Sequence, residues 1–410
     1  MLDRTGDALF IQFEYNEYFQ KCAIMSTRQV LRMFGAVVLL AGLGFGHFQI
    51  TPSPDPGVYP EAGDRADAVR RLNDLARFCA GLEIDRRSEI YDLTRTDDWT
   101  RFAADESARW ESFKKPAQTI RAWVKSELSP HKTANPSEFY PFGGPDILFA
   151  TLMRPSARLY VLVGLEPVGS TPDPKTIRET PLKDFLSQYS VALDDIIRLS
   201  FFRRADLVVE MKTPVIDGVL PVIMVLLART DKEIISVERG LLNTRGEFIN
   251  GENDPPDPPR KPRALRLKFR DSGRGDERTL IYLSQDLSNP AVDSNRGFLS
   301  FVDKSLSRGF GFIKSASYLM HKPVFSSIAG IILRVSDVVL EDDSGMPYRL
   351  FDPSVWKISL YGDYGGPIDL FKDFFQKDLL DAATAGTRPL GFHIGYGKKS
   401  NLLLAVRKAS

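Results

Sequence analysis

Residues 139–165 read FYPFGGPDILFATLMRPSARLYVLVGL, and this stretch contains the two patterns that decide the fold class. In the segment 143–153, a proline and then Asp146 stand where a helix would begin. Proline suits a first helical turn because its missing N–H is not needed there, and the helix dipole favours an acid at that end. Residues 157–165 are almost continuously apolar, as in a strand covered on both faces. The stretch therefore predicts a short helix that leads into a central strand.

A near repeat of the opening motif, YGDYGGPIDLF, occupies residues 361–371. The acid is displaced between the two copies, because Asp146 directly follows its proline whereas Asp369 comes two residues after its own. A shared catalytic role would not tolerate this shift, so we expect a helix-entry device used twice. Tyrosines near the two motifs are candidate ligand-binding residues: Tyr140, Tyr361 and Tyr364.

Periodicity along the rest of the chain predicts further helices and strands. Apolar residues recur at helical spacing in 65–82 and in 99–128, where Pro116 should interrupt the helix. The other helices are expected at 182–204, 297–307 and 365–383. The expected strands are 218–229, 232–238, 264–271, 278–284, 348–352, 355–364, 389–397 and 400–407. Because short turns join some strands and helices join others, we expect an α+β fold with a mixed, largely antiparallel sheet and packed helices, preceded by a helical N-terminal region.

Composition shifts divide the chain into segments, of which the proline-rich connector 251–263 is the clearest boundary. The strand and helix motifs after this connector resemble those before it, which leaves an internal duplication open. The expected segments are a mis-assigned start (1–24), a signal peptide or short anchor (25–46), a proline-rich linker (47–64), a helical region (65–137), a first α+β unit (138–250), the connector, and a second α+β unit (264–410).

The N-terminal region carries a secretory pattern. Arg28 and Arg32 precede an apolar run from residue 33 to 45, and a proline-rich exit follows. The run is too short to cross a hydrocarbon core of about 30 Å comfortably. We expect an exported, bacterial, periplasmic or extracellular protein whose true start is Met25, and its only membrane contact would be this segment, cleaved or retained as a tether.

Composition excludes several classes of protein. The chain has 410 residues, of which 43% are hydrophobic and 26% charged, so it can form substantial cores. Its 54 basic and 53 acidic residues give a net charge of +1, and no basic, aromatic-rich stretch predicts a nucleic-acid partner. The two cysteines, Cys22 and Cys79, cannot form a structural zinc site or a disulfide framework, and we expect Cys79 to be a buried small hydrophobe.

Eight motifs in one order carry a resemblance. They read FYPFGGPDILFA, LYVLVGLEPVG, GVLPVIMVLLART, YLSQDLS, FIKSASYLMH, LEDDSGMPYRLFD, LYGDYGGPIDLF and SNLLLAV. Together they resemble an uncharacterised family of exported bacterial proteins without an assigned activity. The resemblance covers roughly residue 139 to the C-terminus and implies no catalytic residues.

No motif for a catalytic nucleophile, a zinc protease or a phosphate-binding loop is present, and the four histidines are scattered. We therefore expect no cofactor and no metal site. Acids next to strand ends are the better candidates, above all Glu166, which follows an apolar strand. The acids of EDDSG, residues 341–345, should lie in a solvated turn. The candidate binding residues are Tyr140, Asp146, Glu166, Asp286, Tyr361, Tyr364 and His393.

Two functions remain open at this point. The favoured one is a non-catalytic binding or envelope-associated protein whose partner is a small molecule, a glycan or an envelope protein. The alternative is an extracytoplasmic hydrolase that acts on a glycan through paired carboxylates, which in glycoside hydrolases lie about 5–10 Å apart. Convergence of at least two of the acids in one concave pocket would favour the hydrolase.

Overall fold

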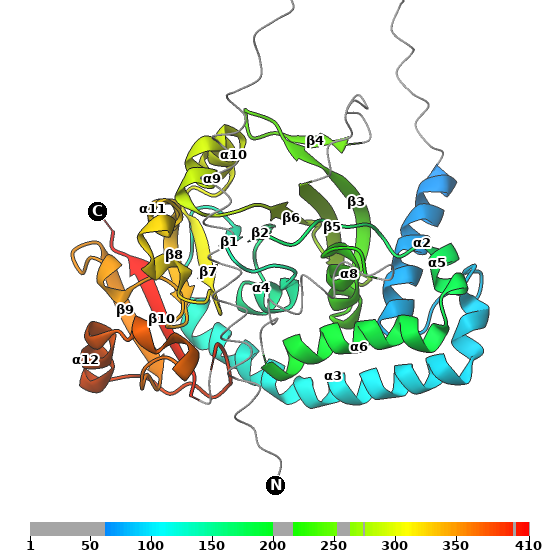
Figure 1. Ribbon diagram of the computed structural model, residues 1–410, viewed down its shortest axis with the longest axis horizontal. Helices are drawn as coiled ribbons and strands as arrows, with labels where there is room; N and C mark the ends of the chain where they lie inside the picture. The colour runs from blue at the N-terminus through cyan, green and yellow to red at the C-terminus, as the bar shows by residue number, and fades with distance from the viewer. Residues whose placement is uncertain (1–61, 200–215, 252–262, 274, 397–398, 410) are drawn as a thin grey trace, which may run out of the picture. The chain divides into compact units, whose positions relative to one another are not determined.

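The computed structural model describes residues 62–199, 216–251, 263–273, 275–396 and 399–409. In these residues a ten-stranded sheet has the order β4-β3-β5-β6-β2-β1-β7-β8-β10-β9 (Figure 1). Five of its nine strand pairings are antiparallel, so the predicted α+β fold with a mixed, largely antiparallel sheet is confirmed. The predicted mis-assigned start and signal segment, residues 1–46, lie outside the described residues.

The middle of the sheet consists of five parallel strands. They are β6 (Arg278–Ser284), β2 (Leu159–Gly164), β1 (Ser137–Tyr140), β7 (Gly309–Ile313) and β8 (Ser336–Glu341). Their residues are almost all buried, because helices cover these strands on both faces; β2 and β7 are apolar accordingly, whereas β1 and β8 also bury Glu138 and Glu341.

Antiparallel strands extend the sheet on both sides. Next to β6 lie β5 (Ala264–Asp271), β3 (Lys232–Leu242) and β4 (Phe248–Asn250). On the other side, β10 (Asn401–Arg407) separates β8 from β9 (Trp356–Gly362). The predicted segments 138–250 and 264–410 both contribute strands to this one sheet.

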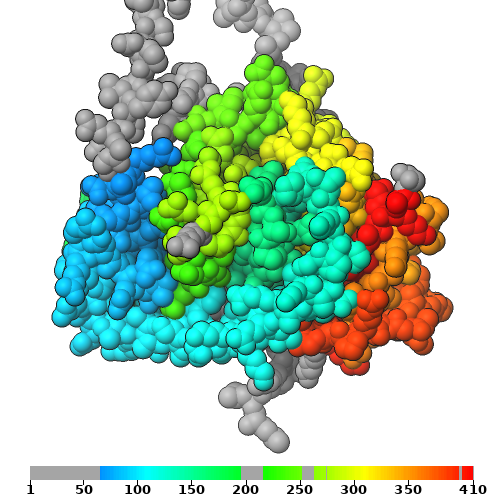
Figure 2. All heavy atoms as spheres, turned by 180° about the vertical axis from the view of Figure 1, so that it is seen from behind, coloured from blue at the N-terminus to red at the C-terminus, as the bar shows by residue number. Residues whose placement is uncertain are grey.

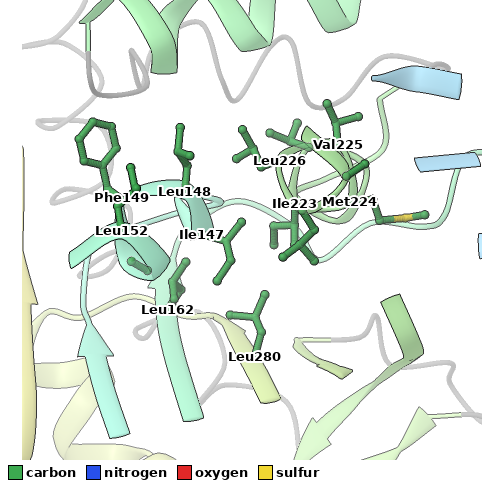
Figure 3. Close-up of a cluster of buried hydrophobic side chains, with 14 of the residues drawn as sticks. Ile147, Leu148, Phe149, Leu152, Leu162, Ile223, Met224, Val225, Leu226 and Leu280 are labelled. Atoms are coloured by element: carbon green, nitrogen blue, oxygen red, sulfur yellow. The ribbon is translucent and has the colours of Figure 1, made fainter. Parts of the chain in front are cut away.

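One face of the sheet packs against a large group of helices. These are α2 (Ala62–Cys79), α3 (Asp97–Trp123), α4 (Ile147–Met153), α6 (Leu182–Leu199) and α8 (Leu220–Arg229). Figure 3 shows side chains of α4 and α8 gathered near Leu162 of β2 and Leu280 of β6. Trp99, Trp110 and Trp123 of α3 are buried in this core.

The opposite face is covered by α9 (Asn289–Ser294), α10 (Arg296–Ser305) and α11 (Ser326–Val335). Alternation along β2 decides which side chain meets which layer: Leu162 belongs to the first core, whereas Val161 and Val163 belong to the second. Figure 2 shows the N-terminal helices in blue and cyan along one side of the molecule, with the cyan residues reaching the orange C-terminal part. Contacts of Trp123 with Tyr361 and Phe392 join these parts.

The shorter elements connect these layers. They are η1 (Tyr91–Arg95), η2 (Val124–Leu128), α5 (Pro174–Glu179), η4 (Leu319–His321), η5 (Pro323–Phe325), η6 (Tyr348–Leu350), η7 (Asp369–Phe374) and α12 (Lys377–Ala385).

The prediction of a strand at 218–229 is wrong, because this segment contains the helix α8. All side chains from Leu220 to Ala228 are buried. A segment that is apolar all round has no period from which helix and strand can be told apart. Pro221 in the first turn was the available signal, since proline is tolerated there and not in a central strand.

Two predicted helices differ in their continuity. Helix α3 runs through Pro116 without the predicted interruption, because the proline lies on the exposed side, where losing one N–H bond is tolerated. The predicted helix 365–383 is instead broken into η7 and α12 at Gln376. There the backbone N–H of Gln376 donates to Tyr364 Oη at 3.0 Å, and its side-chain oxygen accepts from the N–H of Tyr348 at 2.7 Å.

Two predicted strands near the C-terminus are also wrong. Residues 348–352 begin with the 3₁₀ turn η6, and the described part of 389–397 forms a loop. Residues 389–397 contain a proline and three glycines, which are depleted in strands.

Candidate functional site

The carboxyl ends of β1 and β7 meet where the order of the sheet reverses. From β1 the chain adds β2 and then β6 on one side, whereas β7 and β8 lie on the other side. Ligands of open α/β sheets bind at such a switch point, outside the carboxyl ends of the strands. The residues that follow β1, β2 and β7 therefore define the candidate site.

Asp146, Tyr140 and Lys314 form a buried group at this point, which we name the switch-point cluster. Lys314 Nζ lies 2.7 Å from Asp146 Oδ2, and the two side chains are 1% and 3% exposed. Tyr140 Oη donates to the same carboxylate oxygen at 2.9 Å. The ammonium group also lies 3.8 Å from the centre of the Phe149 ring, a favourable cation–π contact.

Burial and charge pairing shift the pKa values of Asp146 and Lys314 in opposite directions. Desolvation raises the pKa of Asp146, and the attraction to Lys314 opposes that rise. Desolvation lowers the pKa of Lys314, and the negative charges of Asp146 and Asp342 oppose that fall. The attraction between Asp146 and Lys314 therefore offsets part of the cost of burying their two charges.

Asp146 also determines how the helix α4 begins. Its Oδ1 accepts a hydrogen bond from the N–H of Phe149 at 3.1 Å, so Asp146 is the N-cap and Pro145 precedes the helix. The sequence had suggested that Pro145 lies in the first turn of the helix. In the structure it lies outside the helix, before the N-cap. In the second copy Asp369 is exposed and is the first residue of a 3₁₀ turn instead. The two motifs therefore do not begin their helices in the same way.

Glu166 lies at the end of β2 and is 5% exposed. Its carboxylate covers two glycines: a Cβ on Gly164 would lie 2.2 Å from Glu166 Oε2, and a Cβ on Gly144 would lie 3.6 Å from it. Tyr282 Oη donates to the backbone oxygen of Glu166 at 2.8 Å and lies 3.3 Å from Oε2 of the same residue. A carboxylate can accept several hydrogen bonds, so Glu166 keeps capacity for further donors.

Strained backbone surrounds the same place. Phe142, in the loop after β1, has a φ of 62°, and Ser315, Ser317 and Tyr318, after β7, have φ values of 54°, 53° and 54°. Left-handed conformations in residues other than glycine cost about 1–3 kcal/mol each and cluster at functional sites. The hydroxyl of Ser315 is buried without a hydrogen-bond partner in the described chain. The strain is thus concentrated at the switch point.

A groove of about 600 Å³ lies at the carboxyl ends of β2 and β6; Leu165 lines it, but Glu166 is not among its lining residues. Leu165, Gln285, Asp286 and Asn295 are among its lining residues. The carboxylate of Asp286 accepts hydrogen bonds from the N–H and the hydroxyl of Ser288, at 2.8 and 2.9 Å. Gln285 is oriented by Asn295, whose amide donates to its oxygen at 3.0 Å, while Gln285 Nε2 has no partner in the described residues.

EDDSG does contain a turn, at residues 343–344, but the prediction that its acids are solvated is wrong. Glu341 is 1% and Asp342 2% exposed, because the strand β8 carries this segment into the sheet and not to the surface. Asp342 accepts from the N–H groups of Ser315 and Ser344, at 2.8 and 3.0 Å. Burial, followed by the charge of Asp343, raises the pKa of Asp342 to about 6. The cavity that these acids line holds about 10 Å³, which is room for one water molecule and not for a sugar.

The tyrosine candidates are occupied by internal contacts. Tyr140 is bonded within the switch-point cluster, and the hydroxyl of Tyr361 donates to Glu127 Oε2 at 2.7 Å. Tyr364 accepts from Gln376, as described above, and all three are buried. These side chains hold the fold together at the carboxyl edge, and none of them presents its ring to solvent.

The remaining candidates lie apart from one another. His393 lines a second groove, of about 690 Å³, with Arg388 and Ser400. Asp286 lines the first groove. Of the seven candidates, the structure brings Tyr140 and Asp146 together and places Glu166 against the glycine loop between them, whereas Asp286 and His393 occupy separate grooves.

Lys314 and Tyr282 belong to the candidate site but did not emerge as candidates from the sequence. Lys314 had one usable signal, since it directly follows the wholly apolar strand β7 and is the only charged residue in the stretch Gly309–Tyr318. Tyr282 had none, because its position in the middle of an apolar strand is typical of a core residue. Its contact with Glu166 exists only through the pairing of β2 with β6.

Two further observations concern the described residues. None of their helices is both long and apolar enough to cross a membrane. No group of three or more histidine, cysteine, aspartate or glutamate side chains within the described ranges is arranged to hold a metal ion. In comparisons with known proteins, no family model, no curated protein and no solved structure matches this chain.

Proposed function

We propose that this protein binds a nucleoside at the switch point, with Glu166 accepting hydrogen bonds from the ribose hydroxyls. The observation that carries the proposal is the position of the Glu166 carboxylate, at the end of β2 and directly over the glycine loop that follows β1. Dinucleotide-binding sheets place an acid for the ribose at this position, about 20 residues after the glycine turn.

The geometry suits a vicinal diol. A carboxylate has two oxygens and accepts only, and a ribose offers two neighbouring O–H donors to it. The glycines permit the close approach, since a side chain on Gly164 would collide with Glu166. The groove of about 600 Å³ lined by Leu165, the residue before Glu166, has the volume of a small-ligand site.

A phosphate at the switch point is disfavoured. In phosphate-binding turns the free N–H groups of a helix N-terminus face the anion. Here the carboxylate of Asp146 already accepts from Phe149 N–H, and Lys314 is engaged with the same carboxylate. The turn also lacks the G-x-G-x-x-G pattern. The ligand is therefore a nucleoside whose substituent is neutral or positively charged.

Isothermal titration calorimetry tests this proposal with adenosine, 2′-deoxyadenosine, S-adenosylmethionine, AMP and NAD. We expect a ribonucleoside without phosphate to bind more tightly than its deoxy analogue and than AMP. Because hydrogen bonds to a charged group contribute about 1.5–3 kcal/mol, Glu166→Gln should weaken binding about 10-fold or more.

The matched control is Glu179→Gln, which changes an exposed acid in α5 and should leave binding unchanged. Equal affinity for adenosine and its deoxy analogue, or no binding of any nucleoside to the folded protein, would refute the proposal.

We also propose that the protein is exported through its N-terminal segment. The basic flank, the apolar run 33–45 and the proline-rich exit support this. Fractionation of the producing cell, with mass spectrometry of the N-terminal peptide, is the test. Cytosolic protein containing peptides from before Met25 would contradict it.

A further inference from the structure

The second groove lies at the same edge of the sheet as the switch point, but at a different place along it. Its lining residues include Asp363, Arg388, His393, Lys399 and Ser400, and its volume is about 690 Å³. Gly362 ends β9 and Asn401 begins β10, so this groove is formed by the chain around two paired strand ends. The pairing fixes Ser400 at a defined position beside the loop that carries His393.

Ser400 and His393 are in direct hydrogen-bond contact in this groove. Ser400 Oγ lies 3.0 Å from His393 Nδ1. The same oxygen accepts a hydrogen bond from the N–H of Ile394 at 2.9 Å. Because one lone pair of the hydroxyl is used by Ile394, its own proton is the group available for donation to the imidazole nitrogen. A hydroxyl within hydrogen-bond reach of a base is the arrangement of an activated nucleophile.

The surroundings keep the imidazole in its basic form. Partial burial and then the charge of Lys314 lower the pKa of His393, so the ring is neutral and can accept a proton at neutral pH. Arg388 and Lys399 contribute positive charge to the groove wall, the first bonded to Glu127 at 2.8 Å and the second 3.9 Å from Asp363.

We propose that Ser400 and His393 are a nucleophile and general base that hydrolyse small carboxylic esters in this groove. Ser400 Oγ attacks the ester carbonyl carbon while its proton moves to His393 Nδ1. The bond to the alcohol oxygen then breaks, and the alcohol leaves with that proton. Water attacks the acyl-serine in the same way, which releases the acid and restores the hydroxyl. This activity goes beyond nucleoside binding and does not use Glu166.

Labelling of the purified protein with a fluorophosphonate probe, followed by peptide mass spectrometry, tests the proposal. We expect phosphonylation at Ser400. Since general-base assistance contributes about 10²–10⁴-fold, His393→Gln should slow this labelling about 100-fold or more. Hydrolysis of p-nitrophenyl acetate should show the same loss in His393→Gln and in Ser400→Ala.

Control variants separate this activity from folding. Ser129→Ala, an exposed serine outside the groove, and Glu179→Gln, an exposed acid in α5, should label at the wild-type rate. Circular dichroism and thermal unfolding confirm that each variant is folded; if His393→Gln is not, His393→Asn takes its place. Absence of label at Ser400, or labelling at equal rates with and without the imidazole, would overturn the proposal.

Discussion

Replacing Lys314 by methionine tests whether the switch-point cluster is a true buried ion pair. At 2.7 Å and an effective dielectric constant of about 20, the attraction between Lys314 and Asp146 is about 6 kcal/mol. The burial of both groups offsets much of this attraction. Removing one partner, however, leaves an uncompensated buried charge, which costs about 3–5 kcal/mol. We therefore expect Lys314→Met to lower the free energy of unfolding by about 3–5 kcal/mol at pH 7.

The double variant Lys314→Met/Asp146→Asn separates the ion pair from simple packing. It removes both charges, and the amide that replaces the carboxylate can still cap α4, because asparagine is among the best N-cap residues. We expect the double variant to be more stable than Lys314→Met alone, since no unpaired charge remains in the core. Urea unfolding, followed by tryptophan fluorescence, measures all three proteins.

The pH dependence of Lys314→Met has a definite sign. Burial already raises the pKa of Asp146 in the folded protein, and loss of the lysine raises it further. A carboxyl group whose pKa is raised in the folded state does not lower the free energy of unfolding below its unfolded-state pKa of about 4. Above that pH it lowers the free energy of unfolding increasingly as the pH rises towards the folded-state pKa. The destabilisation should therefore be smaller at pH 4 than at pH 7.

Lys377→Met, which breaks an exposed ion pair with Asp381, is the matched control and should cost at most about 1 kcal/mol. A cost below about 1 kcal/mol for Lys314→Met, or a double variant that is no more stable than Lys314→Met alone, would refute a charged pair at this position.

Three further predictions concern the core. Burial raises the pKa of Glu138 well above its usual value. Glu138→Gln should therefore be more stable than wild type at pH 8 and lose this difference towards pH 4. A difference in the free energy of urea unfolding that does not change with pH would contradict this. Burial raises the pKa of the Cys79 thiol to about 12, so a thiol reagent at pH 8 should modify Cys79 only after unfolding, and rapid modification of the native protein would count against it. Leu226→Ala, in the fully buried α8, should cost about 2–5 kcal/mol in urea unfolding, compared with about 0.5 kcal/mol or less for the exposed Val324→Ala, and similar costs would show that α8 is not a core helix.

Local sequence patterns predicted the elements whose chemistry is decided within a few residues. The apolar run at Leu159–Gly164 is a buried strand, and the alternation of Leu265, Leu267 and Phe269 with basic residues is a half-buried one. The amphipathic pattern of α2 and α10 likewise predicted helices. In each case the period of the pattern matches one type of element only.

The failures occurred where the same local pattern fits two structures. The apolar segment of α8 gave no period, and the acids of EDDSG looked like a solvated turn because no nearby residue shows what covers them. Asp342 is buried because strand β8 lies inside the sheet and the loop after β7 donates N–H groups to it. Those donors come from another strand, so local sequence cannot predict them.

The sequence by itself determined the fold class and the largely buried character of the central strands, and it indicated Asp146 and Glu166 as candidate binding residues. Only the tertiary structure decided which side chains meet. Lys314 pairs with Asp146, Glu166 covers the glycines at the switch point, and Ser400 contacts His393 in a separate groove. The reason is that the order of the strands in the sheet determines which side chains are in contact. Strands β1 and β7 are neighbours in the sheet although long insertions separate them in the chain, and side chains at their ends interact only once that order is established.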